Sequence, residues 1–303
     1  MKIGIVGLGR MGMNIAKRLL RDNHEVVAYN RTSEKTRLIE REGATGAYSF
    51  DQLIEQLDTP AIVWLMLPAG EIIDKHIEIL LPLMKEGDIL IDGGNTFYKD
   101  DLRRAELLSS KGIRFLDIGV SGGIWGLKEG FCLMVGGDRE TFQEVEPLLK
   151  SLAPNENGYM YCGPTGAGHY VKMIHNGIEY GLMQAYAEGF ELLRASEFGK
   201  EIDFSEIARL WNNGSVIRSW LLELLERAFK EDPGLESIIG YVEDSGEGRW
   251  TLQEAIRLNV PADILALSLF KRFRSRQDES FADKVLAALR AQFGGHRVLK
   301  KQQ

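Results

Sequence analysis

A lysine, a histidine, an asparagine and a glutamate recur at helical spacing within an apolar stretch of the chain. His175, Asn176 and Glu179 follow Lys172 by three, four and seven residues, so an α-helix would place all four on one face over two turns. Most of the residues around them, in the range 171–183, are apolar. We therefore expect a helix that is buried nearly all round, in which charged groups need a reason to be present.

These residue types suit acid–base chemistry. Burial lowers the pKa of a lysine ammonium towards the range of a general base, and a carboxyl group on the same face can serve as a general acid. Lys172 and Glu179 are therefore candidate catalytic groups, with His175 and Asn176 beside them. A solvated stripe or an internal ion pair is the alternative that the helix alone leaves open.

A glycine pattern near the start of the chain predicts a dinucleotide site. Gly7, Gly9 and Gly12 form a G-x-G-x-x-G between a strand-like run and a helical one. In this motif the first glycine permits a tight turn, the second lets the backbone approach a pyrophosphate, and the third allows close packing of helix on strand. The candidate cofactor-binding residues of this turn are Gly7, Leu8, Gly9, Arg10, Met11 and Gly12.

The end of the second predicted strand favours NADP over NAD. An acidic residue there would bind the ribose 2′-hydroxyl of NAD, but this chain has Asn30, Arg31 and Thr32, followed by Lys35. A guanidinium such as that of Arg31 can pair with a 2′-phosphate and stack on an adenine. A surface arginine in a loop is the alternative, and NAD remains possible.

The order of predicted elements indicates an α/β fold with two domains. We expect a doubly wound Rossmann-type domain over 1–164 and an all-helical substrate-binding and oligomerisation domain over 165–303, because continuous apolar strands separated by helices are typical of parallel sheets. Predicted strands cover 2–6, 24–30, 61–67, 88–92, 113–119, 131–136 and 159–162. Predicted helices cover 11–21, 34–41, 70–80, 139–152, 167–195, 204–211, 216–230, 262–273 and 281–293.

Composition excludes several classes of partner. The net charge of −7 argues against nucleic acid, and no apolar run approaches the ~18 residues of a membrane span. We also expect no leader segment, because Met1-Lys2 runs straight into a strand-like segment. Cys132 and Cys162 lie far apart without metal-ligand spacing, so we expect two buried, reduced thiols, no metal, and a cytoplasmic location.

Several segments together resemble the decarboxylating 6-phosphogluconate dehydrogenases, in their short-chain branch. The segments lie at 92–104, 119–123, 166–184, 211–219, 246–251 and 290–296. Three departures from the commonest members stand out: the chain is much shorter, Arg249 stands where many have lysine, and Leu67-Pro68 occupies a position where many have lysine before an Ala-Gly pair.

The resemblance implies oxidation and decarboxylation of 6-phosphogluconate to ribulose 5-phosphate in the pentose phosphate pathway and gluconate utilization. It assigns the base to Lys172 and the acid to Glu179. Leu67, Pro68 and Asn95 would join the cofactor site. The implied substrate-binding residues are Asn95, Ser121, Gly122, Gly123, Lys172, His175, Asn176, Glu179, Tyr180, Arg218, Arg249, Thr251, Arg290 and His296. Arg290 and His296 would come from a partner subunit of a homodimer or homotetramer.

Two other functions compete with this one. A β-hydroxyacid dehydrogenase, for instance one acting on 3-hydroxyisobutyrate, would share the scaffold and the lysine, but would not need the cluster of Arg218, Arg249 and Arg290. A dinucleotide-binding sensor without turnover would be expected to lose the polar face of the helix. The run His175–Tyr180 after Lys172 favours the sugar acid.

Overall fold

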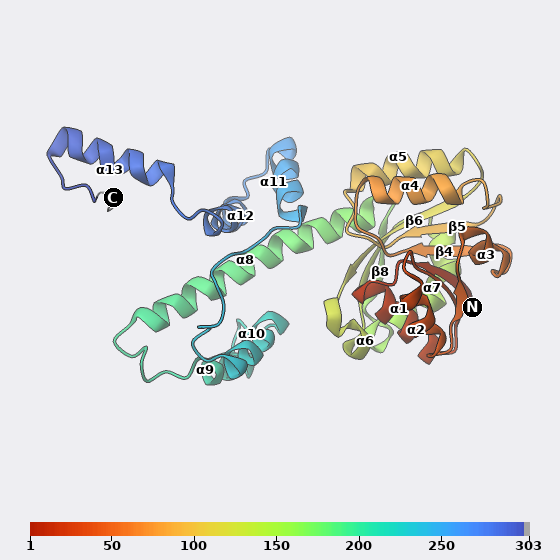
Figure 1. The fold of residues 1–303 in the computed structure, drawn as a ribbon, viewed down its shortest axis with the longest axis horizontal. Helices are drawn as coiled ribbons and strands as arrows, with labels where there is room; N and C mark the ends of the chain where they lie inside the picture. Colours follow the sequence, from red (N-terminus) through yellow and green to blue (C-terminus); the bar gives the residue numbers. More distant parts are fainter. Residues whose placement is uncertain (300–303) are drawn as a thin grey trace. The chain divides into compact units, whose positions relative to one another are not determined.

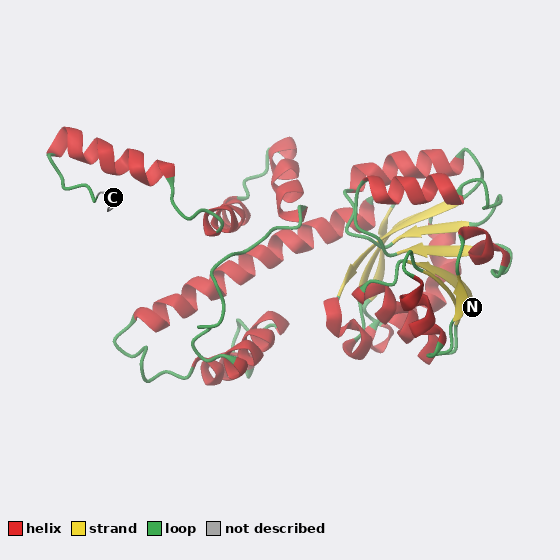
Figure 2. Cartoon of the chain, viewed as in Figure 1, coloured by secondary structure: helices red, strands yellow, loops and turns green. Residues whose placement is uncertain are grey.

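The computed structural model describes residues 1–299, so the last four residues of the predicted second domain, 300–303, lie outside the described part. The chain forms two compact units, Met1–His175 and a second that begins at Asn176. Among the described residues every strand lies in the first unit, and the second unit is helical (Figure 2). The division falls inside one continuous helix, α8 (Ala167–Ala195). The predicted boundary at 164/165 stays a prediction.

The first unit is built on one twisted eight-stranded sheet with the order β3-β2-β1-β4-β5-β6-β7-β8 (Figure 1). All neighbouring pairs are parallel except β6 and β7. The strands are β1 (Lys2–Val6), β2 (Glu25–Tyr29), β3 (Thr45–Ala47), β4 (Ile62–Leu65), β5 (Ile89–Asp92), β6 (Arg114–Ser121), β7 (Cys132–Gly137) and β8 (Tyr159–Gly163). Strand order reverses between β2-β1 and β4, which is where a doubly wound sheet binds its ligand.

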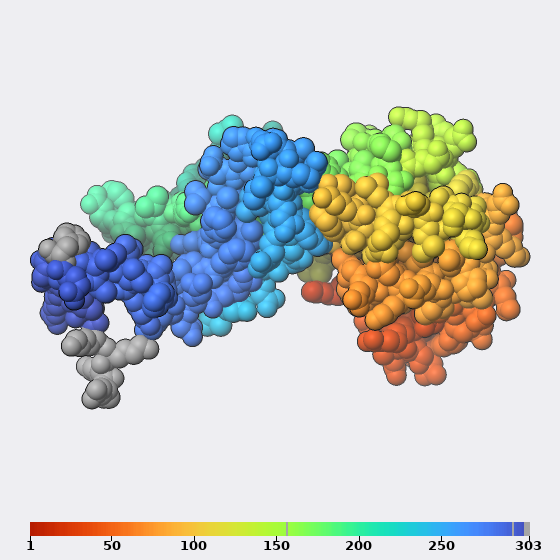
Figure 3. Space-filling model, turned by 90° about the horizontal axis from the view of Figure 1, so that it is seen from above, coloured from red at the N-terminus to blue at the C-terminus, as the bar shows by residue number. Residues whose placement is uncertain are grey.

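Helices cover both faces of this sheet. One apolar cluster joins the sheet to α1, α2 and α7, and a second joins its other face to α3, α4 and α5. Figure 3 shows the face that α4 and α5 form, in orange and yellow. The helices of this unit are α1 (Arg10–Arg21), α2 (Ser33–Glu40), α3 (Phe50–Glu55), α4 (Glu71–Leu80), α5 (Tyr98–Ser109), α6 (Gly126–Glu129) and α7 (Arg139–Leu152). The predicted doubly wound fold is confirmed.

The second unit packs a small aromatic core. Phe190 of α8 meets the rings of Phe204, Trp211 and Phe229 at centroid distances of 6.1, 5.5 and 5.0 Å. The helices after α8 are α9 (Phe204–Asn212), α10 (Trp220–Glu231), α11 (Glu247–Leu258), α12 (Asp263–Ser275) and α13 (Phe281–Gly294). The expected helical second domain is thus observed. Among the described residues, no helix is both long and apolar enough to cross a membrane.

Two expectations about burial are wrong. We expected α8 to be buried nearly all round, but Ile178 is 51% exposed and Leu182 is 44% exposed in this single chain. The helix is enclosed near its start, where it packs on the sheet, and much less so further along. Cys132 is exposed and Cys162 is half-buried, so neither is the fully buried thiol that we expected, and both are free thiols.

Two glycines of α8 should respond oppositely to alanine. A Cβ on Gly168 would lie 2.4 Å from the carbonyl oxygens of Asp117 and Met134, whereas a Cβ on Gly189 would meet nothing within 4 Å. We expect Gly168→Ala to lower the free energy of unfolding by about 1–3 kcal/mol through overpacking. Gly189→Ala should raise it by about 0.5–1 kcal/mol, because alanine loses less conformational entropy in a helix. Denaturant titration measures both, and equal effects would contradict this packing.

Candidate functional site

The glycine turn has the geometry of an anion cradle. Gly7 has a φ of +97°, and a Cβ there would lie 2.5 Å from the carbonyl oxygen of Met66. A Cβ on Gly12 would lie 2.0 Å from the carbonyl oxygen of Gly7, whereas one on Gly9 would meet nothing within 4 Å. No side chain caps α1, and its first turn holds no acidic residue. The amides at this helix start can therefore bind a pyrophosphate.

The carboxyl ends of β1, β4 and β5 meet at one edge of the sheet. A Cβ on Gly7 would lie 2.8 Å from Leu67 Cδ2, and one on Gly94 would lie 2.8 Å from the carbonyl oxygen of Leu67. Leu67 thus lies between the glycine turn and the segment that contains Asn95. Pro68 and Asn95 are exposed at this edge. Ligands bind to open α/β sheets at this edge.

The side chain of Asn30 organises the end of β2. Its Oδ1 accepts from the backbone amide of Leu8 at 2.9 Å, and its Nδ2 donates to Thr32 Oγ1 at 2.7 Å. This asparagine therefore ties the glycine turn to the loop that carries Arg31. Arg31 and Lys35 are both exposed, so their charges are available beside the turn.

The start of α8 is fastened to β6. Both carboxylate oxygens of Asp117 accept from main-chain amides at the start of the helix, from Gly166 at 2.7 Å and from His169 at 2.9 Å. Two residues along the strand, a Cβ on Gly119 would lie 2.3 Å from the Cβ of Lys172. Only glycine fits there, so Lys172 lies directly against the carboxyl-terminal part of β6.

Lys172 lies beside His175 and the loop after β6. Its Nζ is 3.5 Å from His175 Nδ1, and His175 Nε2 is 3.5 Å from Ser121 Oγ. Lys172 is only 7% exposed. Gly122 and Gly123 follow with φ of +125° and +54°, and Gly123 is exposed. The amine of the buried Lys172 and the imidazole of His175 thus lie side by side near the carboxyl end of β6.

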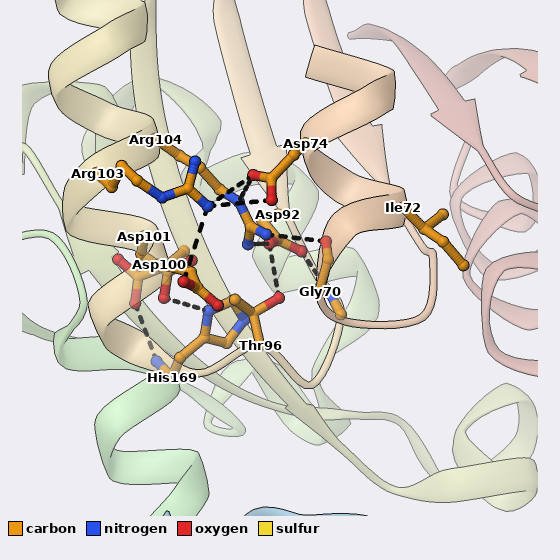
Figure 4. Close-up of polar contacts among 12 residues, drawn as sticks. Gly70, Ile72, Asp74, Asp92, Thr96, Asp100, Asp101, Arg103, Arg104 and His169 are labelled. Atoms are coloured by element: carbon orange, nitrogen blue, oxygen red, sulfur yellow. Dashed lines mark hydrogen bonds and ion pairs between the residues drawn. The ribbon is translucent and has the colours of Figure 1, made fainter. Parts of the chain in front are cut away.

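A network of buried charges lies next to these groups (Figure 4). Arg104 of α5 is 1% exposed and donates to Asp74 at 2.8 Å and to Asp92 at 3.3 Å. One turn earlier, Asp101 bonds His169 Nδ1 of α8 at 2.7 Å. Asp92 also accepts from Thr96 Oγ1 at 2.8 Å and from the Gly94 amide at 2.9 Å. Sequence reasoning missed these residues, because only the fold brings them together.

The charge state of the Asp101–His169 pair is strongly perturbed. Burial raises the pKa of the Asp101 carboxyl to about 7, although His169 acts in the opposite direction. For His169 burial lowers the pKa, but the negative charge of Asp101 and its hydrogen bond outweigh burial and raise it to about 10. We infer that His169 is an imidazolium at neutral pH.

The same residues could be considered as metal ligands. Ligand atoms of Asp92, Asp101 and His169 lie within 4.8 Å of one another. The guanidinium of Arg104 already supplies a positive charge to Asp92, and His169 supplies one to Asp101. We therefore interpret this group as an ion network rather than a metal centre.

In the second unit, α8 and α11 bring together several residues of the predicted substrate site. Thr251 is buried, and a Cβ on Gly177 would lie 2.7 Å from its Cγ2. A Cβ on Gly248 would lie 2.6 Å from the ring of Tyr180. Asn176, at the start of this unit, is 8% exposed, and Glu179 is half-buried.

Three arginines gather near Tyr180 in this unit. Arg249 binds Asp244 through two hydrogen bonds of 2.7 and 3.0 Å, and Arg276 binds the same carboxylate at 2.9 Å. The guanidinium of Arg272 lies 3.4 Å from the centroid of the Tyr180 ring. The sequence analysis missed Arg272 and Arg276, although their spacing of four residues, at the end of α12 and just after it, was a usable signal.

The other predicted substrate residues lie apart from this cluster in the sequence. Arg218 lies in the turn between α9 and α10, and its side chain is exposed. Arg290 lies on α13, and His296 follows that helix; both are exposed. Their assignment to the substrate site stays a prediction.

Family models match almost the whole chain. Residues 2–163 match the NAD binding domain of 6-phosphogluconate dehydrogenase, and residues 168–294 match the 6-phosphogluconate dehydrogenase C-terminal domain. An NAD(+)-dependent, decarboxylating 6-phosphogluconate dehydrogenase from Haloferax volcanii is 42% identical over 302 residues, which cover 99% of each chain.

Solved structures agree with the family models. A 6-phosphogluconate dehydrogenase from Plasmodium falciparum, described in complexes with NADP+ and with 6-phosphogluconate, has a TM-score of 0.83 and 30% identity, covering 99% of this chain and 66% of that longer one. A 3-hydroxyisobutyrate dehydrogenase from Mycobacterium tuberculosis has a TM-score of 0.72 at 21% identity, covering 96% of this chain and 99% of that one. The second likeness shows a shared fold alone.

The raised pKa values predict that stability falls as pH rises. A group whose folded-state pKa is raised holds its proton more tightly in the folded state, so its contribution is lost as pH passes from the ordinary to the folded value. For His169 this window runs from 6.5 to about 10, and for Asp101 from 3.8 to about 7. The free energy of unfolding should therefore drop between about pH 7 and about pH 9.

Urea titrations of the wild type and His169→Gln at these two pH values measure the effect. In His169→Gln most of the decrease in the free energy of unfolding between these pH values should be absent. His24→Gln is the matched control, because burial and the nearby N-terminal charge lower the pKa of His24 and leave it neutral over this range. An identical drop in the wild type and His169→Gln would contradict the assignment.

Proposed function

The chain belongs to the 6-phosphogluconate dehydrogenase family, and on that basis we propose that it oxidises and decarboxylates 6-phosphogluconate to ribulose 5-phosphate and CO₂. One observation carries the proposal: the buried side chain of Lys172 starts against the carboxyl-terminal part of β6, and its amine lies beside His175. The loops after β1, β4, β5 and β6 reach the same edge of the sheet.

We propose NADP as the preferred dinucleotide, with NAD as a second one. The residues that would hold it are the glycine turn 7–12, Asn30 to Thr32, Leu67, Pro68 and Asn95. The open space at Gly9 and the uncapped start of α1 fit a pyrophosphate. No carboxylate stands at the end of β2, and the exposed Arg31 suits a 2′-phosphate. When bound, the nicotinamide supplies a hydride acceptor for C3 of the substrate.

Lys172 acts as the base in the oxidation. Its neutral amine takes the proton of the C3 hydroxyl while C3 loses its hydride, which leaves a 3-keto acid and a lysine ammonium. His175 and Ser121 lie next to this amine and can bind the neighbouring hydroxyl or carboxylate groups. Asn176, Gly122 and Gly123 are assigned to the same task.

The second stage uses Lys172 again, together with Glu179. The C1–C2 bond breaks, its electron pair forms the enediol double bond, and the Lys172 ammonium gives its proton to the former carbonyl oxygen. Glu179 then protonates the carbon that lost CO₂, and Lys172 takes the enediol hydroxyl proton. The product is ribulose 5-phosphate. The base and the acid act from opposite ends of one polar helix face.

We assign the phosphate to the arginine cluster around Tyr180. Arg249, Arg272 and Arg276 bring three positive charges, of which Asp244 offsets one, and arginine suits bidentate phosphate recognition. Thr251 lies near them on α11. Arg218 remains a further candidate, and Arg290 and His296 are assigned to the site from a partner subunit.

That assignment requires at least a homodimer, and we propose a homodimer or homotetramer in the cytoplasm. The helices α12 and α13 expose apolar side chains in the single chain, among them Phe281 at 79%, Ile264 at 68% and Leu267 at 64%. Such side chains suit burial between subunits. We keep the domain division 1–164 and 165–303 as part of this proposal.

The competing functions make different demands. A 3-hydroxyisobutyrate-type enzyme has no phosphate to bind, and the arginine cluster around Tyr180 favours a phosphorylated substrate over it. A sensor without turnover needs no buried amine at the sheet edge. Initial rates with 6-phosphogluconate and 3-hydroxyisobutyrate, each with NADP and NAD, separate the three. Turnover of 3-hydroxyisobutyrate alone, or of neither acid, would overturn the proposed function.

Replacing Lys172 tests the base. Lys172→Met should reduce kcat by roughly 10²–10⁴-fold, because the variant has no group to accept the hydroxyl proton. Dinucleotide affinity, measured by fluorescence titration, should change little. Lys150→Met on α7 is the matched control and should keep full activity. Near-normal kcat in Lys172→Met would contradict the assignment.

Replacing Arg31 tests the choice of dinucleotide. Arg31→Ala should raise KM for NADP by roughly 10- to 100-fold, the effect of losing a charge-assisted hydrogen bond, and should leave KM for NAD nearly unchanged. Arg41→Ala, at the other end of α2, should affect neither. Equal increases for both dinucleotides would limit Arg31 to adenine stacking.

A further inference from the structure

The geometry points to Asp101 and His169 as positioning residues that hold the start of α8 so that Lys172 meets the substrate in a fixed place. Neither residue belongs to the predicted catalytic or binding set. This role rests on the proposed function, since it concerns the base of that reaction. Three observations support it: the pair is buried at the start of α8, it joins α5 to α8, and it leaves two polar atoms without a hydrogen bond.

Two side chains from two different elements hold the same turn of α8. Asp117 of β6 accepts from the main-chain amides of Gly166 and His169. Asp101 of α5 binds the His169 side chain at 2.7 Å. All three residues are at most 1% exposed. The helix start is therefore fixed both to the sheet and to the helix layer that covers it.

Lys172 follows His169 by three residues, which is a rise of about 4.5 Å and most of one turn. The helix is continuous between them, so a displacement at His169 is passed on to Lys172. Lys172 Cβ has no spare room against Gly119. Misplacing a catalytic group by about 1 Å can reduce the rate by about 10²-fold.

Stability alone does not account for the pair, although protonated His169 contributes to it at neutral pH. Asp101 Oδ1 and His169 Nε2 are buried without a hydrogen-bond partner among the described residues, and unsatisfied buried polar atoms destabilise a fold. Replacing a buried ion pair by apolar side chains is often neutral or stabilising. The pair leaves two of its own polar atoms without a hydrogen bond, yet it anchors the helix that carries the base. A positioning role explains this better than a stabilising role does.

The pair is also connected to the loop after β5. Arg104 lies one turn from Asp101 on α5 and binds Asp92, which holds Gly94 and Thr96 on either side of Asn95. The charged groups near His169 are Asp101 from α5, Asp92 from β5 and Asp117 from β6. The helix α5 thus joins the position of α8 to that of the loop assigned to cofactor and substrate.

The test replaces both members of the pair by apolar side chains of similar size, Asp101→Leu with His169→Met. We expect a folded protein whose kcat is lower by roughly 10²-fold, with KM for 6-phosphogluconate and for NADP nearly unchanged. The primary isotope effect with 6-phosphogluconate deuterated at C3 should rise, because misplacing the base slows hydride transfer. A merely structural pair would not change that isotope effect.

A matched control uses a buried aspartate far from α8 in the chain. Asp88, the residue before β5, accepts from the amides of Ala61 and Lys85 at 2.7 Å. Asp88→Asn should lower thermal stability while kcat and the isotope effect stay at wild-type values. This separates lost stability from a misplaced base.

Asp101→Asn keeps an acceptor for the ring of His169 and removes only the charge. Its kcat should fall by roughly 10-fold, less than in the double variant, with a raised isotope effect. This variant decides the matter if the double variant does not fold. Wild-type kcat and isotope effect in the folded double variant, or in Asp101→Asn should the double variant not fold, would overturn the positioning role. A wild-type protein inactive on 6-phosphogluconate would instead overturn the proposed function, on which the role depends.

Discussion

The attachment of α8 to β6 is the contact on which the proposed site depends. Asp117 accepts from two amides at the start of the helix, and Gly119 leaves room for the Cβ of Lys172. A carboxylate that caps a helix also complements the positive end of its dipole. Because the cap and the close contact are two residues apart on one strand, the strand fixes both the height and the rotation of the helix that carries the base.

The sheet explains why chemistry would concentrate at this edge. Strands β1, β4, β5 and β6 run parallel, so their following loops emerge together: the glycine turn, Leu67, Asn95 and Ser121. A Cβ on Gly7 or on Gly94 would collide with the segment after β4, which shows how closely the first three of these loops approach one another. A dinucleotide bound along this edge would lie across the reversal of strand order, as the fold class favours.

Periodicity predicted the long regular elements well and the short or tertiary features poorly. The bounds of β1, α7 and α8 agree with the predicted ranges, because each has a clear apolar pattern. β3, with the sequence Thr-Gly-Ala, has no apolar run, and α11 was not predicted although it carries Arg249 and Thr251. The Asp101–His169 pair could not be predicted, because its members are 68 residues apart and meet only when α5 and α8 pack on the same sheet.

The most direct test of the account is the ratio of labelled CO₂ released from C1-labelled 6-phosphogluconate to dinucleotide reduced. Oxidation at C3 by the Lys172 base leaves a β-keto acid on which the same ammonium acts, so we predict one CO₂ for each hydride transferred. Dinucleotide reduction without release of the label would contradict the account, because it would show a hydroxyacid oxidation that stops before the carbon–carbon bond breaks.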